Sequence, residues 1–152
     1  MNTEKTTQII KQHIKLVQDN IYDIIAELTK RAAHHDESKL VNPELEGYSK
    51  VTDKIEGTVY GTPEYIAATS ELGPALKHHY QHNSHHPEHY INGIQGMNLI
   101  DIIEMFCGWQ AAATRNGDIR KSIEVGQSRY DYGDDIKQIL LNTVDHLDAS
   151  IA

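Results

Sequence analysis

The residues most able to do chemistry are histidines concentrated in the middle of the chain. Six of the ten histidines fall within twelve residues, namely His78, His79, His82, His85, His86 and His89. The dipeptide His35-Asp36 comes earlier, with His13 before it and Asp101 after the histidine-rich segment. Neutral imidazole and carboxylate groups hold zinc, iron, manganese or cobalt in proteins. The set therefore predicts a metal site, with enough ligands for one or two divalent ions.

Not all of these histidines can reach the same centre. His78 and His79 are neighbours on a predicted helix, so their side chains diverge by about 100° and at most one of them faces the site. His79 fits the order of ligands better. His85 and His86 lie in a predicted loop, where both side chains can reach metal. The alternative is a polar surface loop that is rich in histidine by chance.

Two carboxylates complete the predicted ligand set. Adjacent side chains such as His35 and Asp36 can point at one ion where the backbone turns at a helix end, and Asp36 could bridge two ions. Asp101 lies in the most apolar predicted helix, where a carboxylate is rare unless it is paired or bound to metal. We favour metal binding for Asp101. The alternative is a buried carboxylate satisfied by hydrogen bonds or by an arginine such as Arg31.

The elements that must position these residues are predicted to be helices. Residues 4–33 carry apolar side chains from Ile9 to Leu28 at spacings of three and four, which define one helical face. Proline after a capping residue predicts helix starts at Asn42-Pro43-Glu44 and at Thr62-Pro63-Glu64. The second of these helices runs towards His82 and is kinked or broken at Gly73-Pro74.

The remainder of the chain continues this pattern. Residues 83–97 contain Pro87 and two glycines and predict a loop. Three further helices are predicted, beginning after Asn98, after Asn116-Gly117-Asp118 and after Gly133. The helix after Asn98 is apolar nearly all round, so we expect it to be central and Trp109 to lie in the core. Without any strand-like alternation, the sequence predicts an all-α, single compact domain of about six helices over residues 1–152.

Composition limits the classes of partner. The 152 residues suit one domain, and the single cysteine, Cys107, excludes an internal disulfide and favours a cytoplasmic location. Neither a signal peptide nor a run of about 20 apolar residues is present, so no membrane association is predicted. With a net charge of −8 and no basic run, the chain is not expected to bind long nucleic acid. A small phosphorylated substrate remains compatible, and a homo-oligomer is left open.

The ligand order His13, His35-Asp36, His79, His85-His86, Asp101 resembles that of the HD-domain metal-dependent phosphohydrolases. HDESK at 35–39 resembles the HD-x-G-K segment of the HD-GYP cyclic-dinucleotide phosphodiesterases, and HHPEHYINGIQG at 85–96 resembles their HHE…DG segment. Pro87 replaces their glutamate and the GYP tripeptide is absent, which speaks against cyclic-dinucleotide specificity.

Longer segments resemble a small family of phage and bacterial proteins of uncharacterised function. HDESKLVNPE, HHYQHNSHHPEHY and EMFCGWQAA carry this resemblance, which covers roughly residues 10–130. That family usually has aspartate before the tryptophan, where this chain has Gly108 before Trp109. Asp101, seven residues earlier than Gly108, keeps the HD order of ligands intact.

The resemblance implies an HD-like helical bundle that hydrolyses a small nucleotide or another phosphoester. One or two divalent transition-metal ions (Mn, Fe, Co, Zn or Ni) would produce hydroxide near neutral pH. The implied ligands are His13, His35, Asp36, His79, His85, His86 and Asp101. Besides Asp36, the implied catalytic residues are Glu37 or Glu104 for proton transfer and Lys39 for the substrate phosphate. The other implied substrate contacts are Arg31, Lys77, His82, His89 and Tyr90.

Three alternatives remain open from the sequence. A di-iron oxygenase of the HD type would use similar ligands with O₂, because ligand types do not by themselves select the metal. A hemerythrin-like bundle is suggested by the i, i+4 pairs His78/His82, His82/His86 and His85/His89, although Pro87 counts against a continuous helix there. The third alternative is a metal-stabilised module that binds a partner.

Overall fold

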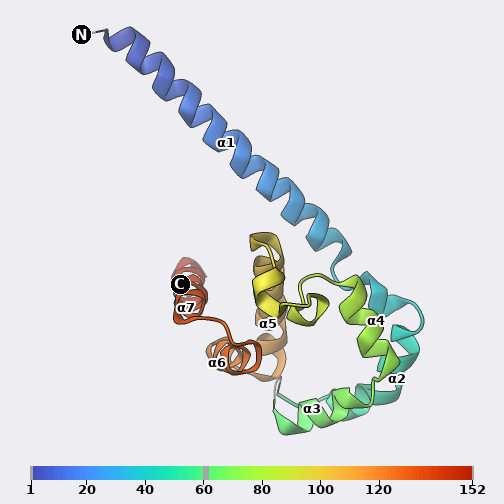
Figure 1. Ribbon diagram of the computed structural model, residues 1–152. Helices are drawn as coiled ribbons and strands as arrows, with labels where there is room; N and C mark the ends of the chain where they lie inside the picture. Colours follow the sequence, from blue (N-terminus) through green and yellow to red (C-terminus); the bar gives the residue numbers. More distant parts are fainter. Residues whose placement is uncertain (1, 60–61, 152) are drawn as a thin grey trace. The chain divides into compact units, whose positions relative to one another are not determined.

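The computed structural model describes residues 2–59 and 62–151, which form helices joined by short turns (Figure 1). Seven α-helices and three 3-10 helices are described. In chain order they are α1 (Thr3–His34), η1 (Glu37–Leu40), α2 (Glu44–Ile55), α3 (Pro63–Ser70), α4 (Pro74–His82), η2 (Pro87–His89), η3 (Gly93–Gly96), α5 (Leu99–Asn116), α6 (Ile119–Tyr130) and α7 (Asp134–Ile151). The described residues contain no strand, so the prediction of an all-α fold is confirmed.

Side-chain caps explain several helix starts. The Thr62 side chain accepts a hydrogen bond from the backbone of Tyr65 at the start of α3, and Asp118 caps α6 in the same manner. Asn98 and Asp101 form a reciprocal capping box at the start of α5. Such caps satisfy N–H groups that have no partner within the helix. Helix starts predicted from these polar residues are therefore confirmed.

The structure makes two predicted helix boundaries more exact. The helix α2 begins at Glu44 with Pro43 at the cap position, one residue later than the motif suggested, and the Asn42 side chain still accepts a hydrogen bond of 3.3 Å from the first-turn backbone N–H of Glu46. The stretch from Thr62 towards His82 is broken in two, because Gly73 has a left-handed φ of 48° and Pro74 starts a new helix. This break accounts for seven helices where about six were predicted.

The chain divides into two units, residues 1–35 and residues 36–152, which we describe separately. The described part of the first unit consists essentially of α1. None of the residues Thr3–His34 is buried. The apolar face predicted for this segment therefore exists on a regular helix, but nothing within the first unit covers it.

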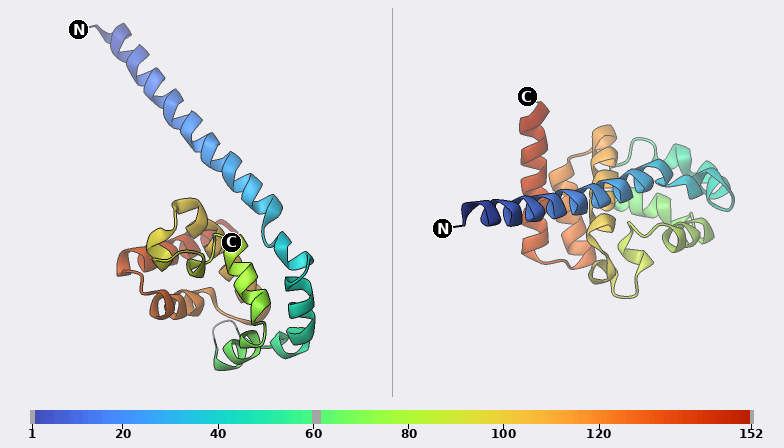
Figure 2. Two further views of the ribbon diagram at one scale, coloured as in Figure 1. Left: turned by 45° about the vertical axis from the view of Figure 1, so that its right-hand side comes forward. Right: turned by 90° about the horizontal axis from the view of Figure 1, so that it is seen from above.

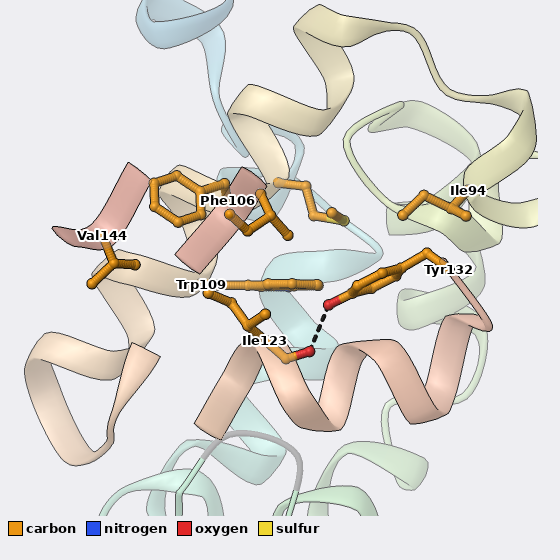
Figure 3. Close-up of a cluster of buried hydrophobic side chains, with 8 residues drawn as sticks. Ile94, Phe106, Trp109, Ile123, Tyr132 and Val144 are labelled. Atoms are coloured by element: carbon orange, nitrogen blue, oxygen red, sulfur yellow. Dashed lines mark hydrogen bonds between the residues drawn. The ribbon is translucent and has the colours of Figure 1, made fainter. Parts of the chain in front are cut away.

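The second unit has its main hydrophobic core around α5. Met105, Phe106 and Trp109 of α5 pack with Ile123 of α6 and with other apolar side chains from η3, the α6–α7 turn and α7 (Figure 3). Trp109 is buried, as predicted. The hydroxyl of Tyr132 donates a hydrogen bond of 2.5 Å to the backbone carbonyl of Ile123, so the one polar atom of that ring is satisfied inside the core.

A smaller core joins α2 to α4 and to the turn that precedes α4. It contains Val51 of α2 with Leu72 and Ala75 at and after the helix break. A Cβ atom placed on Gly47 of α2 would lie 2.4 Å from the Cβ of Ala75, so only glycine permits this close approach. Figures 1 and 2 show α2 and α4 side by side. The contact brings the first turn of α2 next to the histidines of α4.

No helix in the described part of the chain has both the length and the apolar character needed to cross a membrane.

Candidate metal centre

Four side chains from three segments bring potential metal ligands together within the second unit. Asp36 precedes η1, His79 lies in α4, and His85 and His86 lie in the loop between α4 and η2. One donor atom from each of the four lies within 4.8 Å of every other. His79 and His85 are buried, while Asp36 and His86 are partly buried. The structure therefore contains a cluster of three imidazoles and one carboxylate that could hold a metal ion.

Distances between donor atoms suit ligation of one ion. Nε2 of His79 lies 2.8 Å from Nε2 of His86, and Asp36 Oδ1 lies 3.5 Å from His79 Nε2 and 3.4 Å from His85 Nε2. Two ligands about 2.0–2.1 Å from a transition metal are separated by roughly 2.9 Å at a right angle and by roughly 3.4 Å at a tetrahedral angle. The observed separations cover this range, so an ion could be accommodated with little movement of the side chains.

Glu44 orients His79 by contacting Nδ1, the ring nitrogen that points away from the cluster. Oε2 of this fully buried carboxylate lies 2.8 Å from Nδ1 of His79, and Oε1 lies 2.7 Å from Nδ1 of His78. Burial tends to raise the pKa of Glu44, but hydrogen bonds from His78, Ser38 and His79 outweigh it and hold the pKa below its ordinary value. A carboxylate accepts the Nδ1 proton of His79, which leaves the Nε2 lone pair directed at the cluster.

The Asn83 side chain is consistent with this tautomer of His79. Its amide nitrogen lies 2.8 Å from Ser38 Oγ, 2.8 Å from the His79 carbonyl and 3.1 Å from His79 Nδ1. An amide nitrogen has two protons, which the two oxygen atoms can accept. The Nδ1 proton of His79 thus remains available for Glu44. The same amide links the end of α4 to η1, next to Asp36.

Glu104 has the corresponding place behind His85. Its Oε1 lies 3.1 Å from Nδ1 of His85, whose Nε2 faces Asp36. Histidines that bind metals commonly donate their other ring proton to a carboxylate, which fixes the tautomer and increases the basicity of the ligand nitrogen. Two of the three imidazoles in the cluster thus have a carboxylate on the ring nitrogen that points away from the cluster.

Two histidines of the cluster, His79 and His86, favour the neutral form that metal binding requires. Burial and the nearby positive charge of Lys39 lower the pKa of His79. Burial, together with the neighbouring His85 and His79, lowers the pKa of His86 to about 2. A neutral imidazole retains a lone pair for a metal, whereas an imidazolium has none. Protons would therefore compete weakly with a metal ion at these two side chains.

Asp36 is held in an uncommon backbone conformation. Its φ of 59° and ψ of 16° are left-handed, a region that aspartate tolerates better than most residues. Oδ1 faces His79 and His85, whereas Oδ2 lies 2.6 Å from the ammonium group of Lys39. Lys39 also lies over the ring of Tyr48, 5.2 Å from its centroid. If Asp36 bridged two ions, Lys39 would have to leave Oδ2.

Asp101 lies outside this cluster and holds the histidine loop instead. Its buried carboxylate accepts hydrogen bonds from Ser84 Oγ (2.8 Å), from the Tyr90 hydroxyl (2.7 Å) and from the backbone N–H of Asn98 (3.1 Å). Ser84 and Tyr90 flank the segment that carries His85 and His86. This arrangement matches the alternative in which hydrogen bonds satisfy Asp101, and its role as a ligand stays a prediction.

The other residues predicted for the site are not among the four residues of this cluster. His13, Arg31 and His35 belong to the first unit, so their roles stay predictions. The side chains of Glu37, Lys77, His82 and His89 are exposed, and their roles in substrate binding or catalysis also stay predictions. His82 stacks on His78 with ring centroids 3.9 Å apart, and His89 Nδ1 lies 2.7 Å from the Tyr80 carbonyl. Gly108 is partly buried in α5.

Glu44 is the residue that the sequence patterns did not identify. Asn42-Pro43-Glu44 predicted only a helix start, and acidic residues are common in the first turn of exposed helices. No local signal shows that Glu44 is completely buried, or that His78 and His79 lie against it from more than thirty positions along the chain. Only the packing of α2 on α4 produces this contact.

Comparison with known proteins places the chain in a family without assigning a function. No curated protein and no solved structure matches it. A family model does match, over residues 2–150, and its description is "Family of unknown function (DUF5662)". Because the match covers nearly the whole sequence, the chain belongs to the DUF5662 family.

Proposed function

We propose that the chain binds a divalent transition-metal ion through Asp36, His79, His85 and His86 and is a metal-dependent phosphohydrolase for small phosphorylated molecules. The observation that carries the metal site is the convergence of these four donors, with Glu44 and Glu104 behind two of the imidazoles. A helix surface that is merely rich in histidine would not need carboxylates on the ring nitrogens that point away from the cluster. Mixed imidazole and carboxylate ligands suit Zn, Mn, Fe, Co and Ni.

The hydrolytic assignment follows from the resemblance to HD phosphohydrolases and from the charge around the cluster. A bound divalent ion would supply a nucleophile derived from water and would neutralise charge on phosphoryl oxygens. Lys39 lies next to Asp36, where its ammonium group could exchange the carboxylate for a substrate phosphate. Glu44 and Glu104 would hold His79 and His85 in the ligand tautomer throughout.

The hemerythrin-like alternative loses most of its geometric basis. Helix α4 ends at His82, and His86 lies beyond it in extended backbone at the start of η2. His82/His86 and His85/His89 are thus not i, i+4 pairs on an α-helix. His78 and His82 do share α4, but they stack on one another and His78 contacts Glu44.

Metal content of the purified protein tests the first half of the proposal. Asp36→Ala should keep its helical content and lose stoichiometric metal, measured by elemental analysis after loading and desalting. Asp131→Ala is a matched control, because Asp131 is an exposed aspartate with a similar left-handed φ of 51°. Equal metal content in the two folded variants would remove Asp36 from the site.

Assays of substrate turnover test the second half of the proposal, the phosphohydrolase activity. Wild-type protein loaded with Mn²⁺ or Co²⁺ should release phosphate or a nucleotide product from a panel of mono-, tri- and cyclic nucleotides, and chelation should abolish this activity. Lys39→Ala should raise KM without changing metal content, whereas Lys50→Ala, which removes an exposed lysine paired with Glu46, should do neither. If the loaded protein turns over no phosphorylated compound but iron-loaded protein consumes O₂ with a polyol, the oxygenase alternative replaces this proposal.

A further inference from the structure

Lys39 contacts both the candidate metal centre and the ring of Tyr48. Its ammonium group lies 2.6 Å from Oδ2 of Asp36 and 5.2 Å from the centroid of the Tyr48 ring, over the face of that ring. The two contacts differ in kind. Asp36 is a charged group that the proposed metal ion also uses, whereas the aromatic ring attracts the ammonium group through its electron-rich face. The two partners of Lys39 would therefore respond differently when a ligand binds.

Tyr48 reaches this position from the same face of α2 as Glu44. The two residues are four positions apart in the sequence, so their side chains are neighbours on the helix surface. Glu44 contacts Nδ1 of His79, and the Tyr48 ring lies at 86° to the His79 ring with centroids 6.4 Å apart. The 3-10 helix η1, which carries Lys39, packs on α2. One face of α2 thus contacts both a proposed metal ligand and the nearby lysine.

The ring of Tyr48 is an uncharged partner for Lys39. Burial raises the pKa of the Tyr48 hydroxyl above its ordinary value, and the nearby Tyr65 and Asp36 raise it further. The hydroxyl therefore stays protonated, and the attraction between ring and ammonium group is a cation–π contact. Because the ring has no negative charge, it does not repel an incoming anion. The contact with Lys39 can consequently persist when a phosphate binds.

A lysine beside a metal ion needs such a support because its side chain is long and flexible. Holding that side chain in one conformation costs entropy. The Lys39 side chain is 35% exposed, so a ligand can reach the ammonium group, which could also turn into solvent. A metal ion on Asp36 would compensate part of the negative charge that attracts Lys39. The contact with Tyr48 would then keep the ammonium group beside the ion.

We infer that Tyr48 is a positioning residue, which holds the ammonium group of Lys39 where a phosphate can bind to the metal ion and to the lysine together. This role rests on the proposed function, because it concerns the same site. Lys39 would exchange Asp36 for a phosphate oxygen while its ammonium group stays over the ring. The lysine side chain is then ordered before the phosphate arrives, which strengthens the complex.

Binding of inorganic phosphate to the Co²⁺-loaded full chain, measured by calorimetry, tests this role. Tyr48→Leu should weaken phosphate binding about 3–10-fold with unchanged metal content, and Lys39→Ala should weaken it by at least as much. In a Lys39→Ala background, Tyr48→Leu should have no further effect. In a Lys50→Ala background its full effect should remain, because Lys50 is an exposed lysine of α2 that pairs with Glu46. The two cycles separate coupling to Lys39 from a general loss of structure.

A second pair of variants keeps the shape of the ring, because Tyr48 also packs against the smaller core. Tyr48→Phe should bind phosphate like the wild type. Tyr48→trifluorophenylalanine should bind it about 3-fold more weakly, since fluorine withdraws electrons from the ring face. Equal affinities for these two variants, or equal effects of Tyr48→Leu with and without Lys39, would overturn the role of Tyr48 alone. Wild-type protein that holds no metal, or holds metal but binds no phosphate, would overturn the proposed function and this role with it.

Discussion

Glu44 and Asp101 are two fully buried carboxylates in the first turns of two helices, and they serve different groups. Glu44, at the start of α2, receives Nδ1 protons from His78 and His79 and so acts on an imidazole of the candidate metal site. Asp101, at the start of α5, receives hydroxyl and backbone protons from residues on either side of the histidine loop. Both carboxylates are buried, so burial does not distinguish them. The hydrogen-bond donors of each carboxylate indicate which part of the structure it positions.

A substitution of Asp101 should have the largest effect on stability. Asp101→Ala removes the acceptor of three hydrogen bonds, one of which is half of the α5 capping box, and leaves the partly buried hydroxyl groups of Ser84 and Tyr90 without this acceptor. We expect a loss of about 3 kcal/mol in the free energy of unfolding, measured by denaturant titration of metal-free protein. The folded fraction should still bind metal. If metal binding is lost while stability is unchanged, Asp101 is a ligand, as its sequence context predicted, and the contrast with Glu44 disappears.

Replacing Glu44 should act mainly on the metal. Glu44→Gln keeps the size of the side chain but removes the charge that fixes His79. We expect metal to bind about 10–100-fold more weakly, as measured by competition with a chelator of known affinity. Glu46→Gln is a suitable control, because Glu46 lies on the same helix, exposed and paired with Lys50. Equal affinities for the two variants would mean that Glu44 is only structural.

Glu104 provides a smaller test of the same principle. It contacts Nδ1 of His85 at 3.1 Å, a longer contact than that of Glu44 with His79, so Glu104→Gln should weaken metal binding by about 10-fold. The exposed Glu124→Gln serves as the control. If Glu104→Gln instead lowers kcat while metal affinity is unchanged, Glu104 transfers a proton in catalysis, as the sequence suggested, and does not position His85.

Tyr90 should give the smallest change. Tyr90→Phe removes one of the donors to Asp101 and should lower the free energy of unfolding by about 1 kcal/mol, measured by denaturant titration. The KM of any substrate found in the nucleotide panel should stay the same, because the hydroxyl contacts Asp101. A raised KM with unchanged stability would restore the predicted role of Tyr90 in substrate binding.

Helical structure followed closely from the sequence because it depends on local interactions. The apolar spacing of α1, the caps of α3, α5 and α6, and the Gly73-Pro74 break are all readable from residues within a few positions of one another. Capping hydrogen bonds and the left-handed preference of glycine act over a single helical turn. The same holds for the donor types at the site, since the chemistry of histidine and aspartate does not depend on the fold.

Which donors meet was decided by the tertiary structure. The fold brings Asp36 together with His79, His85 and His86, which lie more than forty positions later in the chain. Asp101 instead accepts hydrogen bonds from Ser84 and Tyr90. Glu44 reaches His79 because Gly47 allows α2 to approach Ala75 of α4 closely. The sequence by itself determined the helices and a supply of potential metal ligands. Only long-range packing selected four of them and placed a carboxylate behind two, because that geometry depends on contacts between elements distant in the chain.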